Sequence, residues 1–322
     1  MKAPGTAFDP RVDLGRGLVL ANPVTVASGT FGFGFEQEAL AGIGHLGAIF
    51  SKGTTLQARE GNLPPRIAET AAGMLNSIGL QNPGVELVAR DYAPKWAKWT
   101  VPVLVNVAGA DISEYVAVVR QLDGVIGIAG LELNISCPNI AHGLDFASEP
   151  GAAARCVAAV RAVTELPLVV KLSPNVTDIT EIARAVEDAG ADAVSAVNTY
   201  VGSKIHLASR RPVLPGHGSG GLSGPAIKPL ALAAVMRVRR SVRIPVIGVG
   251  GIANAVDALE FLVAGAEAVQ VGSANFTNPQ ASREIVDGCQ EFALEHGLLH
   301  YSDLRWRELD HPGIEESGAP AD

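Results

Sequence analysis

The chain has 322 residues, of which 48% are hydrophobic and 18% charged, so it can bury a large core and is not expected to be disordered. Its formal net charge of −8 at pH 7 makes nucleic acid and anionic membranes poor partners. Residues 1–14 lack the apolar segment of a signal peptide, and no run of about 18 apolar residues occurs. We therefore expect a cytoplasmic protein with no membrane span.

In chain order, the stretch GRGLVLANP predicts an N-terminal β-hairpin, and short β-branched runs then alternate with helical patterns. The runs predicted as strands are residues 23–28, 48–52, 101–107, 131–136, 167–173, 192–198, 244–250 and 267–273. Such alternation favours parallel βαβ units, and eight of them predict a closed (β/α)8 TIM barrel; an open doubly wound sheet is the alternative. We expect one barrel domain over residues 1–300 and a polar C-terminal tail over residues 301–322.

Two connections are too long for simple turns: residues 53–83 and residues 199–224. Long loops in a compact domain are usually functional. Both leave the carboxyl end of a predicted strand, which is where barrel enzymes build their sites. We therefore expect long βα loops around the C-terminal mouth.

Each predicted strand is apolar until its last positions, which are polar or glycine. They are Ser28, Lys52, Asn106, Asn134, Lys171, Asn198, Gly250 and Ser273. Taken singly, a strand-end asparagine is more often a turn former and a lysine more often solvated. Their recurrence favours one hydrogen-bonding pocket that accepts anions. Lys171 lies in register with buried valines, and a lone buried ammonium is costly, so it should meet an anionic or electron-rich ligand.

Three glycine-rich segments follow the later predicted strands: residues 220–229, 248–254 and 271–276. Bare glycines let backbone N–H groups approach a phosphate, and phosphate sites recur after the seventh and eighth strands of barrels. The segments together predict a phosphate-bearing ligand. The GxGxxG pattern is absent, so a Rossmann dinucleotide site is not expected.

The three cysteines are Cys137, Cys156 and Cys289. An odd number without a CxxC pair argues against disulfides and against a metal or iron–sulfur site in this chain. Cys156 and Cys289 lie in apolar helical patterns and are predicted to be core residues. Cys137 instead follows a strand, before a glycine-bearing stretch typical of a lid.

A structural role for Cys137 is one interpretation. A protease-type nucleophile is not favoured, because His142 is the only histidine near it in the sequence. A thiolate beside a flavin or a substrate ring could instead act as a general base. No cation adjoins Cys137 in the sequence, so its pKa should stay near about 8.5 and activity should rise toward alkaline pH.

Several motifs resemble those of the dihydroorotate dehydrogenase family and cover nearly the whole chain in the family's order. They are ASGTFGFG, MLNSIGLQNPG, VNVAG, NISCPN, VKLSPN, AVNT, GGLSGPAIKP and GVGGI. The resemblance implies an FMN-binding (β/α)8 barrel that oxidises (S)-dihydroorotate to orotate in pyrimidine biosynthesis. A cysteine at position 137 and the expected absence of a membrane anchor resemble class 1 of the family. The segments ASGTFGFG and IGLQNPG most resemble subclass 1B.

The resemblance also implies residue roles. Cys137 would remove the C5 proton while hydride leaves C6 for N5 of FMN. Substrate would be bound by Lys52, Asn76, Ser77, Ile78, Gly79, Leu80, Asn134, Asn198 and Thr199. The flavin ring and ribityl chain would be bound by Ser28, Lys52, Gly53, Asn106, Asn134, Lys171 and Val197, and the phosphate by Gly224, Gly250, Gly251, Gly272 and Ser273.

Subclass 1B further implies a partner subunit that carries FAD and a 2Fe–2S cluster, in a heterotetramer built on a homodimer of this chain, with NAD+ as acceptor. Alternatives stay open. They are a class 1A-like homodimer that uses fumarate, a dihydropyrimidine-oxidising relative, and a non-catalytic barrel that binds a phosphate ligand. A sugar-phosphate isomerase barrel has no supporting motif.

Overall fold

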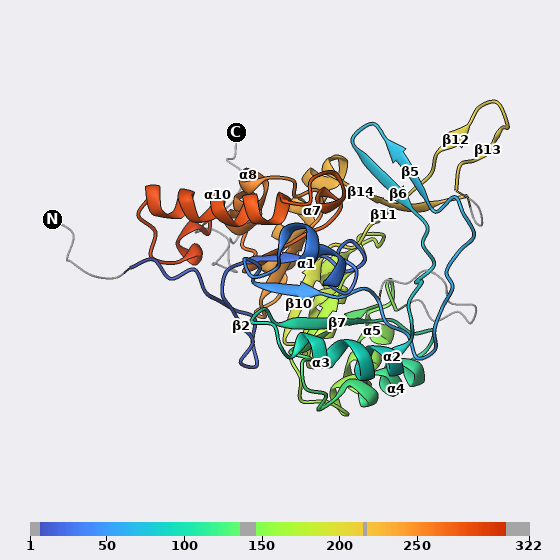
Figure 1. The fold of residues 1–322 in the computed structure, drawn as a ribbon, viewed down its shortest axis with the longest axis horizontal. Coiled ribbons are helices and arrows are strands. Elements are labelled where there is room, and N and C mark those ends of the chain that lie inside the picture. The colour runs from blue at the N-terminus through green and yellow to red at the C-terminus, as the bar shows by residue number, and fades with distance from the viewer. Residues whose placement is uncertain (1–6, 136–145, 215–217, 307–322) are drawn as a thin grey trace, which may run out of the picture.

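Eight parallel strands close into a barrel surrounded by helices (Figure 1). The structure is a computed structural model and describes residues 7–135, 146–214 and 218–306. Around the barrel the strands are β10 (Ala193–Ala196), β15 (Val246–Val249), β16 (Ala268–Val271), β3 (Val24–Val26), β4 (Ala48–Phe50), β7 (Val103–Val107), β8 (Gly130–Asn134) and β9 (Leu168–Lys171). Each predicted run matches one of them, and β8 begins one residue before its predicted run. The (β/α)8 prediction is confirmed, and the open-sheet alternative is wrong.

Helices cover the outside of the barrel. Among the described residues they are α1 (Phe35–Ala41), α2 (Val85–Leu87), the π-helix η1 (Val88–Tyr92), α3 (Ala93–Trp96), α4 (Ile112–Leu122), α5 (Pro150–Arg161), α6 (Ile179–Asp188), the 3-10 turn η2 (Pro225–Ile227), α7 (Lys228–Ser241), α8 (Ala255–Val263), α9 (Ala274–Thr277), α10 (Ala281–Glu295) and the 3-10 turn η3 (Tyr301–Leu304). No helix in these described ranges is both long and apolar enough to cross a membrane.

The main core lies between the helices and the outward faces of the strands. Parallel strands with helices on their outer side are buried on both faces, which explains their continuous apolar runs. Cys156 on α5 and Cys289 on α10 are both fully buried there, so their prediction as core residues is confirmed. Burial raises the pKa of each thiol to about 12, so neither supplies a thiolate near neutral pH.

The N-terminal hairpin covers the end of the barrel opposite the mouth, as predicted. It consists of β1 (Val12–Asp13) and β2 (Val19–Leu20), which pair antiparallel. Leu14, Leu18 and Leu20 from this hairpin are buried in a second core cluster with inward-facing strand residues such as Phe50 and Leu104. The hairpin therefore fills the barrel interior from below.

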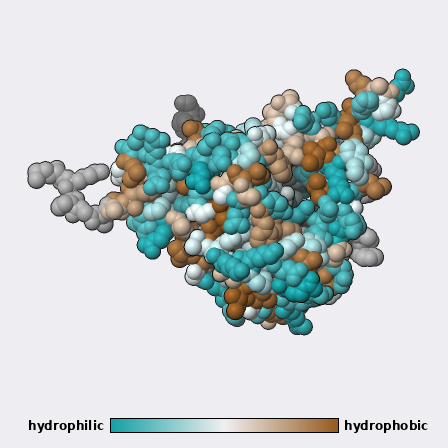
Figure 2. Space-filling model, viewed as in Figure 1, coloured by the Kyte–Doolittle hydropathy of each residue, from teal (hydrophilic) through white to brown (hydrophobic). Residues whose placement is uncertain are grey.

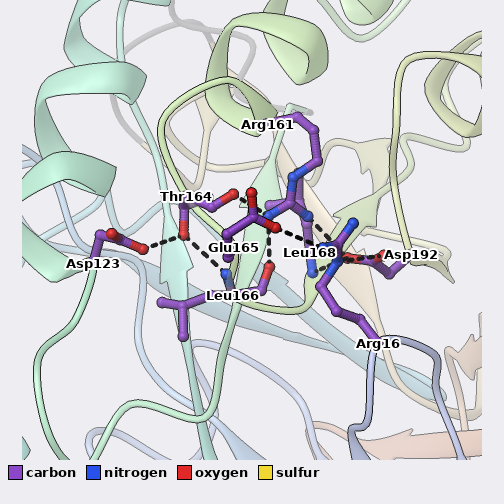
Figure 3. Close-up of polar contacts among 8 residues, drawn as sticks. All are labelled: Arg16, Asp123, Arg161, Thr164, Glu165, Leu166, Leu168 and Asp192. Atoms are coloured by element: carbon purple, nitrogen blue, oxygen red, sulfur yellow. Dashed lines mark hydrogen bonds and ion pairs between the residues drawn. The ribbon is translucent and has the colours of Figure 1, made fainter.

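An ion-pair network fixes the hairpin turn to the barrel (Figure 3). The Asp192 carboxylate accepts hydrogen bonds from Arg16 Nε at 2.9 Å, Arg161 Nη1 at 3.0 Å and the Leu168 amide at 2.9 Å. Arg16 also reaches Glu165 at 2.8 Å. Its bond to Asp192 raises the pKa of Arg16, whereas burial lowers that of Arg161. Charge-assisted bonds thus link the hairpin to the starts of β9 and β10.

The two long connections form a second sheet beyond the mouth. Its antiparallel strands, in order, are β11 (Tyr200–Gly202), β14 (Gly220–Ser223), β6 (Gly73–Asn76) and β5 (Ile67–Thr70). This sheet and the hairpin of β12 (Ile205–His206) and β13 (Arg211–Pro212) project from the barrel at the upper right of Figure 1. This sheet was not predicted from the sequence, because the two pairs of strands that form it lie far apart along the chain.

Hydrophilic residues cover most of the face drawn in Figure 2, and apolar residues lie scattered among them. Some of the exposed apolar side chains lie on the projecting elements, namely Ile67, Val201, Ile205 and Leu207. Their position beyond the barrel leaves them outside the protein core.

The first residues of the predicted tail pack on the barrel. Tyr301 is buried and its ring meets that of Phe8 edge to face at 5.0 Å. Arg305 Nη2 donates to Glu267 at 2.6 Å, and burial raises the pKa of this glutamate. Residues 307–322 lie outside the described ranges.

His45 should make the fold sensitive to acid. Its Nε2 lies 3.0 Å from Ser282 Oγ, and burial, with a contribution from Arg283, lowers its pKa from 6.5 to about 4. Below pH 6.5 the unfolded chain takes up a proton that the folded chain does not. The free energy of unfolding should therefore fall by up to about 3 kcal/mol as pH drops toward 4, and then level off for this group.

Urea unfolding of the wild type and His45→Gln between pH 7 and 4 would measure this loss. The variant should lose less stability over that range than the wild type does. His206→Gln is the matched control, since His206 also contacts a serine, Ser209, but is exposed. Identical pH dependence in the wild type and His45→Gln would contradict the prediction.

Candidate active site

A buried carboxylate lies at the centre of the polar layer inside the barrel. Glu132 on β8 is 0% exposed and accepts three hydrogen bonds. Asn106 Nδ2 donates to its Oε2 at 2.6 Å, and Ser195 Oγ and Gln270 Nε2 donate to its Oε1 at 2.8 Å each. Four strands therefore meet at one side chain.

Strand register explains why these residues meet. Asn106 pairs with Glu132 across β7 and β8, and Lys171 pairs with Asn134 across β8 and β9 and with Ser195 across β9 and β10. Alternate residues of a strand face the same side, so Glu132 and Asn134 both face inward, with Asn134 nearer the mouth.

Lys171 has a partner within the chain. It is 4% exposed, and its Nζ lies 3.3 Å from Gln270 Oε1, 3.4 Å from Ser28 Oγ and 4.0 Å from Glu132 Oε2. The expectation that Lys171 is a lone buried charge is wrong, because Glu132 lies beside it. Glu132 offsets part of the cost of burying it.

Asn106 presents an unpartnered acceptor beside the loop after β4. The residue is 1% exposed, and its Oδ1 is buried with no hydrogen-bond partner in the described ranges. A Cβ added to Gly53 would lie 3.1 Å from this oxygen and 3.4 Å from Leu80 Cδ2. Glycine at position 53 therefore lets the loop approach both groups. Such an oxygen can accept a hydrogen bond from a group bound at the mouth.

The segment predicted to bind substrate, residues 76–80, runs along the mouth from β6. Asn76 Nδ2 donates to the Gly221 carbonyl at 3.1 Å, on the paired strand β14. Asn62 supports the next residues, since its Nδ2 donates to Ser77 Oγ at 2.9 Å and its backbone amide donates to the Ile78 carbonyl at 2.9 Å. The segment is therefore held at both of its ends.

Two residues of this segment have positive φ angles. They are Gly79, at 76°, and Leu80, at 55°. A positive φ is strained for leucine. Such strain is found most often at functional sites. Side chains added at Gly79 would clash with Asn62.

Asn134 on β8 and Asn198 after β10 also meet at the mouth. Asn198 Nδ2 donates to Asn134 Oδ1 at 3.3 Å, and the Thr199 amide donates to Asn198 Oδ1 at 2.8 Å. Tyr115 from α4 donates to the Asn134 carbonyl at 2.7 Å. Val197 is buried just before them. These amides form a second polar group at the mouth.

Lys52 lies two residues after the end of β4, near the same mouth, and is half-buried. Its backbone amide donates to the Gly32 carbonyl at 2.8 Å. Burial, with repulsion from Arg66, lowers the pKa of its ammonium. An anionic ligand would therefore bind favourably beside Lys52. Its negative charge would stabilise the ammonium against both burial and the repulsion from Arg66.

The three glycine-rich segments lie close together at the carboxyl ends of neighbouring strands. Val249 pairs with Gln270 and Val271 pairs with Val26, so the ends of β15, β16 and β3 lie side by side. Gly250 and Gly251 have φ angles of 131° and 76° and pack on the start of α7, where a Cβ on either would lie 2.7 Å from a side chain. Gly224, with φ of 100°, precedes η2.

Gly272 and Ser273 follow β16 and lead into α9. Gly272 differs from the other glycines of these segments, because among the described residues a Cβ built on it would meet only Ala27, at 3.8 Å. The space beside this backbone is therefore open. Such a position suits a ligand oxygen held by backbone N–H groups.

The sequence profile of the family described as dihydroorotate dehydrogenase matches residues 15–293 of this chain. The chain belongs to the dihydroorotate dehydrogenase family. Relatives include the "Dihydroorotate dehydrogenase B (NAD(+)), catalytic subunit" of Desulforamulus reducens, which is 52% identical over 89% of this chain and 94% of its own length. Proteins of the same name are similar in Pelobacter propionicus (51% identical; 89% and 95% covered) and Porphyromonas gingivalis (49%; 91% and 95%).

The mouth of this dihydroorotate dehydrogenase family member brings together Asn106, Asn134, Lys171 and Asn198 from the predicted set with three polar residues that were not predicted. Glu132, Ser195 and Gln270 were missed, although each is a polar residue in the middle of an otherwise apolar strand. That break in the apolar pattern is the signal that could have found them. Cys137 and His142 lie outside the described residues, so the role of Cys137 stays a prediction.

Proposed function

We propose that this chain is the catalytic subunit of an NAD+-linked dihydroorotate dehydrogenase, which oxidises (S)-dihydroorotate to orotate on FMN in pyrimidine biosynthesis. One observation supports it above the others. The buried ammonium of Lys171 lies 4.0 Å from Glu132 Oε2, and Asn106 donates to that same carboxylate oxygen through Nδ2. The other end of the Asn106 amide, Oδ1, is buried at the floor of the barrel mouth and has no hydrogen-bond partner among the described residues. A flavin ring has an N–H group that can donate to Asn106 Oδ1. The ring also gains negative charge on reduction, which the Lys171 ammonium would stabilise.

The residues present fit FMN. Asn106 Oδ1 would accept from the ring, Lys171 and Ser28 would lie beside it, and Gly53, Asn134 and Val197 would border it. The phosphate would be held by the backbone at Gly224, Gly250, Gly251, Gly272 and Ser273. Bound FMN supplies the two-electron acceptor for the hydride.

The chain's own residues would hold the substrate and move its proton. Lys52 and the segment from Asn76 to Leu80 would bind the carboxylate and one ring edge, and Asn134, Asn198 and Thr199 would bind the other. Cys137 would take the C5 proton on its sulfur. Holding carboxylate and ring at once fixes C5 against the base, which is the condition for efficient proton transfer.

Gly272→Ala should separate phosphate binding from folding. The methyl would fill the open space beside Ala27, so stability should change by less than about 1 kcal/mol. A phosphate would be pushed off the backbone, so FMN should bind at least about tenfold more weakly, measured by fluorescence titration of the apoprotein. Equal FMN affinity in variant and wild type would contradict a phosphate at Gly272.

We further propose that electrons leave through a partner subunit carrying FAD and a 2Fe–2S cluster, in a cytoplasmic heterotetramer built on a homodimer of this chain. Support comes from the "catalytic subunit" in the relatives' names and from the exposed apolar side chains on the projecting strands. The isolated chain, reduced by dihydroorotate without air, should not be reoxidised by NAD+. Rapid reoxidation by fumarate would favour a stand-alone class 1A-like enzyme instead.

A further inference from the structure

As a carboxylate, Glu132 accepts hydrogen bonds and cannot donate them. This fixes the direction of every hydrogen bond around it. Asn106 and Gln270 must each turn their NH2 group toward it, and Ser195 must turn its hydroxyl hydrogen toward it. An amide that points its nitrogen one way points its oxygen the other way. The carboxylate therefore sets the orientation of two amides.

The outward ends of those amides face different groups. Gln270 Oε1 faces Lys171 Nζ at 3.3 Å, where an NH2 group would be repelled. Asn106 Oδ1 faces Gly53 and the loop at the mouth, and it has no partner in the described part of the chain. The acceptor that the mouth offers to a ligand is thus a consequence of Glu132, which itself is fully buried.

Glu132 also limits the positive field of Lys171. Its Oε2 lies 4.0 Å from the ammonium, and both groups are buried, so solvent screens them little. For a group bound over this floor, the negative charge of Glu132 would weaken the positive potential of Lys171. A neutral residue at position 132 would leave the cation uncompensated.

We propose that Glu132 is a positioning residue that fixes the polarity of the mouth floor: it holds Asn106 as an acceptor toward the bound flavin and keeps the flavin's reduction potential low by offsetting Lys171. This inference rests on the proposed function, because it concerns a flavin over that floor. Glu132 acts through Asn106, Gln270 and Lys171 and does not touch the reacting atoms.

The test is the reduction potential of FMN bound to Glu132→Gln, titrated anaerobically against a reference dye at pH 6.5. Glutamine removes the negative charge and can donate to Asn106, which would then turn its NH2 group outward. Loss of the negative charge favours reduced flavin, so the equilibrium constant for reduction should rise at least about tenfold, or about 30 mV for two electrons.

A second variant has the opposite expected sign. Ser195→Ala removes one donor from the carboxylate and leaves its charge less compensated, so the equilibrium constant should fall by about threefold or more. This change is small and keeps the barrel packed. Glu267→Gln is the control, because Glu267 is also buried but lies at the other end of β16, bonded to Arg305.

A rise for Glu132→Gln and a fall for Ser195→Ala, with Glu267→Gln within about twofold of wild type, would support the proposal. No change for Glu132→Gln, or the same change in the control, would overturn it. If Glu132→Gln does not fold or retain FMN, the sign of the Ser195→Ala shift decides: a fall supports the proposal, and no change or a rise overturns it. Wild-type protein that binds no flavin would instead overturn the proposed function.

Discussion

Cys137→Ser is expected to lower kcat for dihydroorotate oxidation by about 10²–10⁴-fold, the usual contribution of a general base. A serine hydroxyl keeps its proton at neutral pH, so it is a far weaker base than a thiolate at the same place. The FMN spectrum should be unchanged, because Cys137 is not among the proposed flavin contacts. Cys137 lies outside the described residues, so the prediction depends on the NISCPN motif and family membership.

Cys156→Ala is the matched control for this variant. Cys156 is buried in α5 and its pKa is raised by burial, so the variant should lose stability but keep its kcat within about twofold. The wild-type rate should rise from pH 6 to 9 as the thiol at position 137 ionises, given its free pKa of about 8.5. A flat profile, measured where proton transfer limits the rate, would contradict the role of Cys137.

Lys171→Met is expected to affect both turnover and stability. The variant leaves Glu132 as a buried carboxylate without a cation, which should lower the free energy of unfolding by about 3 kcal/mol. It also removes the positive charge beneath the proposed flavin, so kcat should fall by about 10²-fold or more. Urea unfolding and anaerobic flavin reduction would measure the two effects separately.

The double variant Lys171→Met/Glu132→Gln separates these causes. With both charges gone, most of the lost stability should return, while turnover should stay low. Lys204→Met is the control, since Lys204 is exposed and donates only to the Glu69 carbonyl among the described residues. Full recovery of turnover in the double variant would contradict a direct role for the Lys171 charge.

The barrel could be predicted from the sequence because its signal is local. Each apolar run ends in a polar or glycine residue, and parallel strands bring all of those ends to one mouth. Asn106, Lys171 and the three glycine segments were found in this way. Their meeting in the structure follows from strand direction alone.

The remaining features depend on contacts between distant segments. Glu132 meets Ser195 and Gln270 only after the barrel has closed and its shear is fixed, and no local pattern encodes that register. The sheet beyond the mouth pairs Asn76 with Gly221, which are 145 residues apart. For Glu132, Ser195 and Gln270 the sequence contains a signal, which is a polar residue within an apolar strand. It does not show which of these residues contact one another.

The most direct test of the central claim is an anaerobic titration of the purified chain with dihydroorotate, followed by its visible spectrum. We predict a yellow protein whose flavin absorbance bleaches on addition of dihydroorotate, with orotate formed in equal amount. A yellow protein that does not bleach would contradict the substrate, and a protein that stays colourless after incubation with FMN would contradict the flavin site itself.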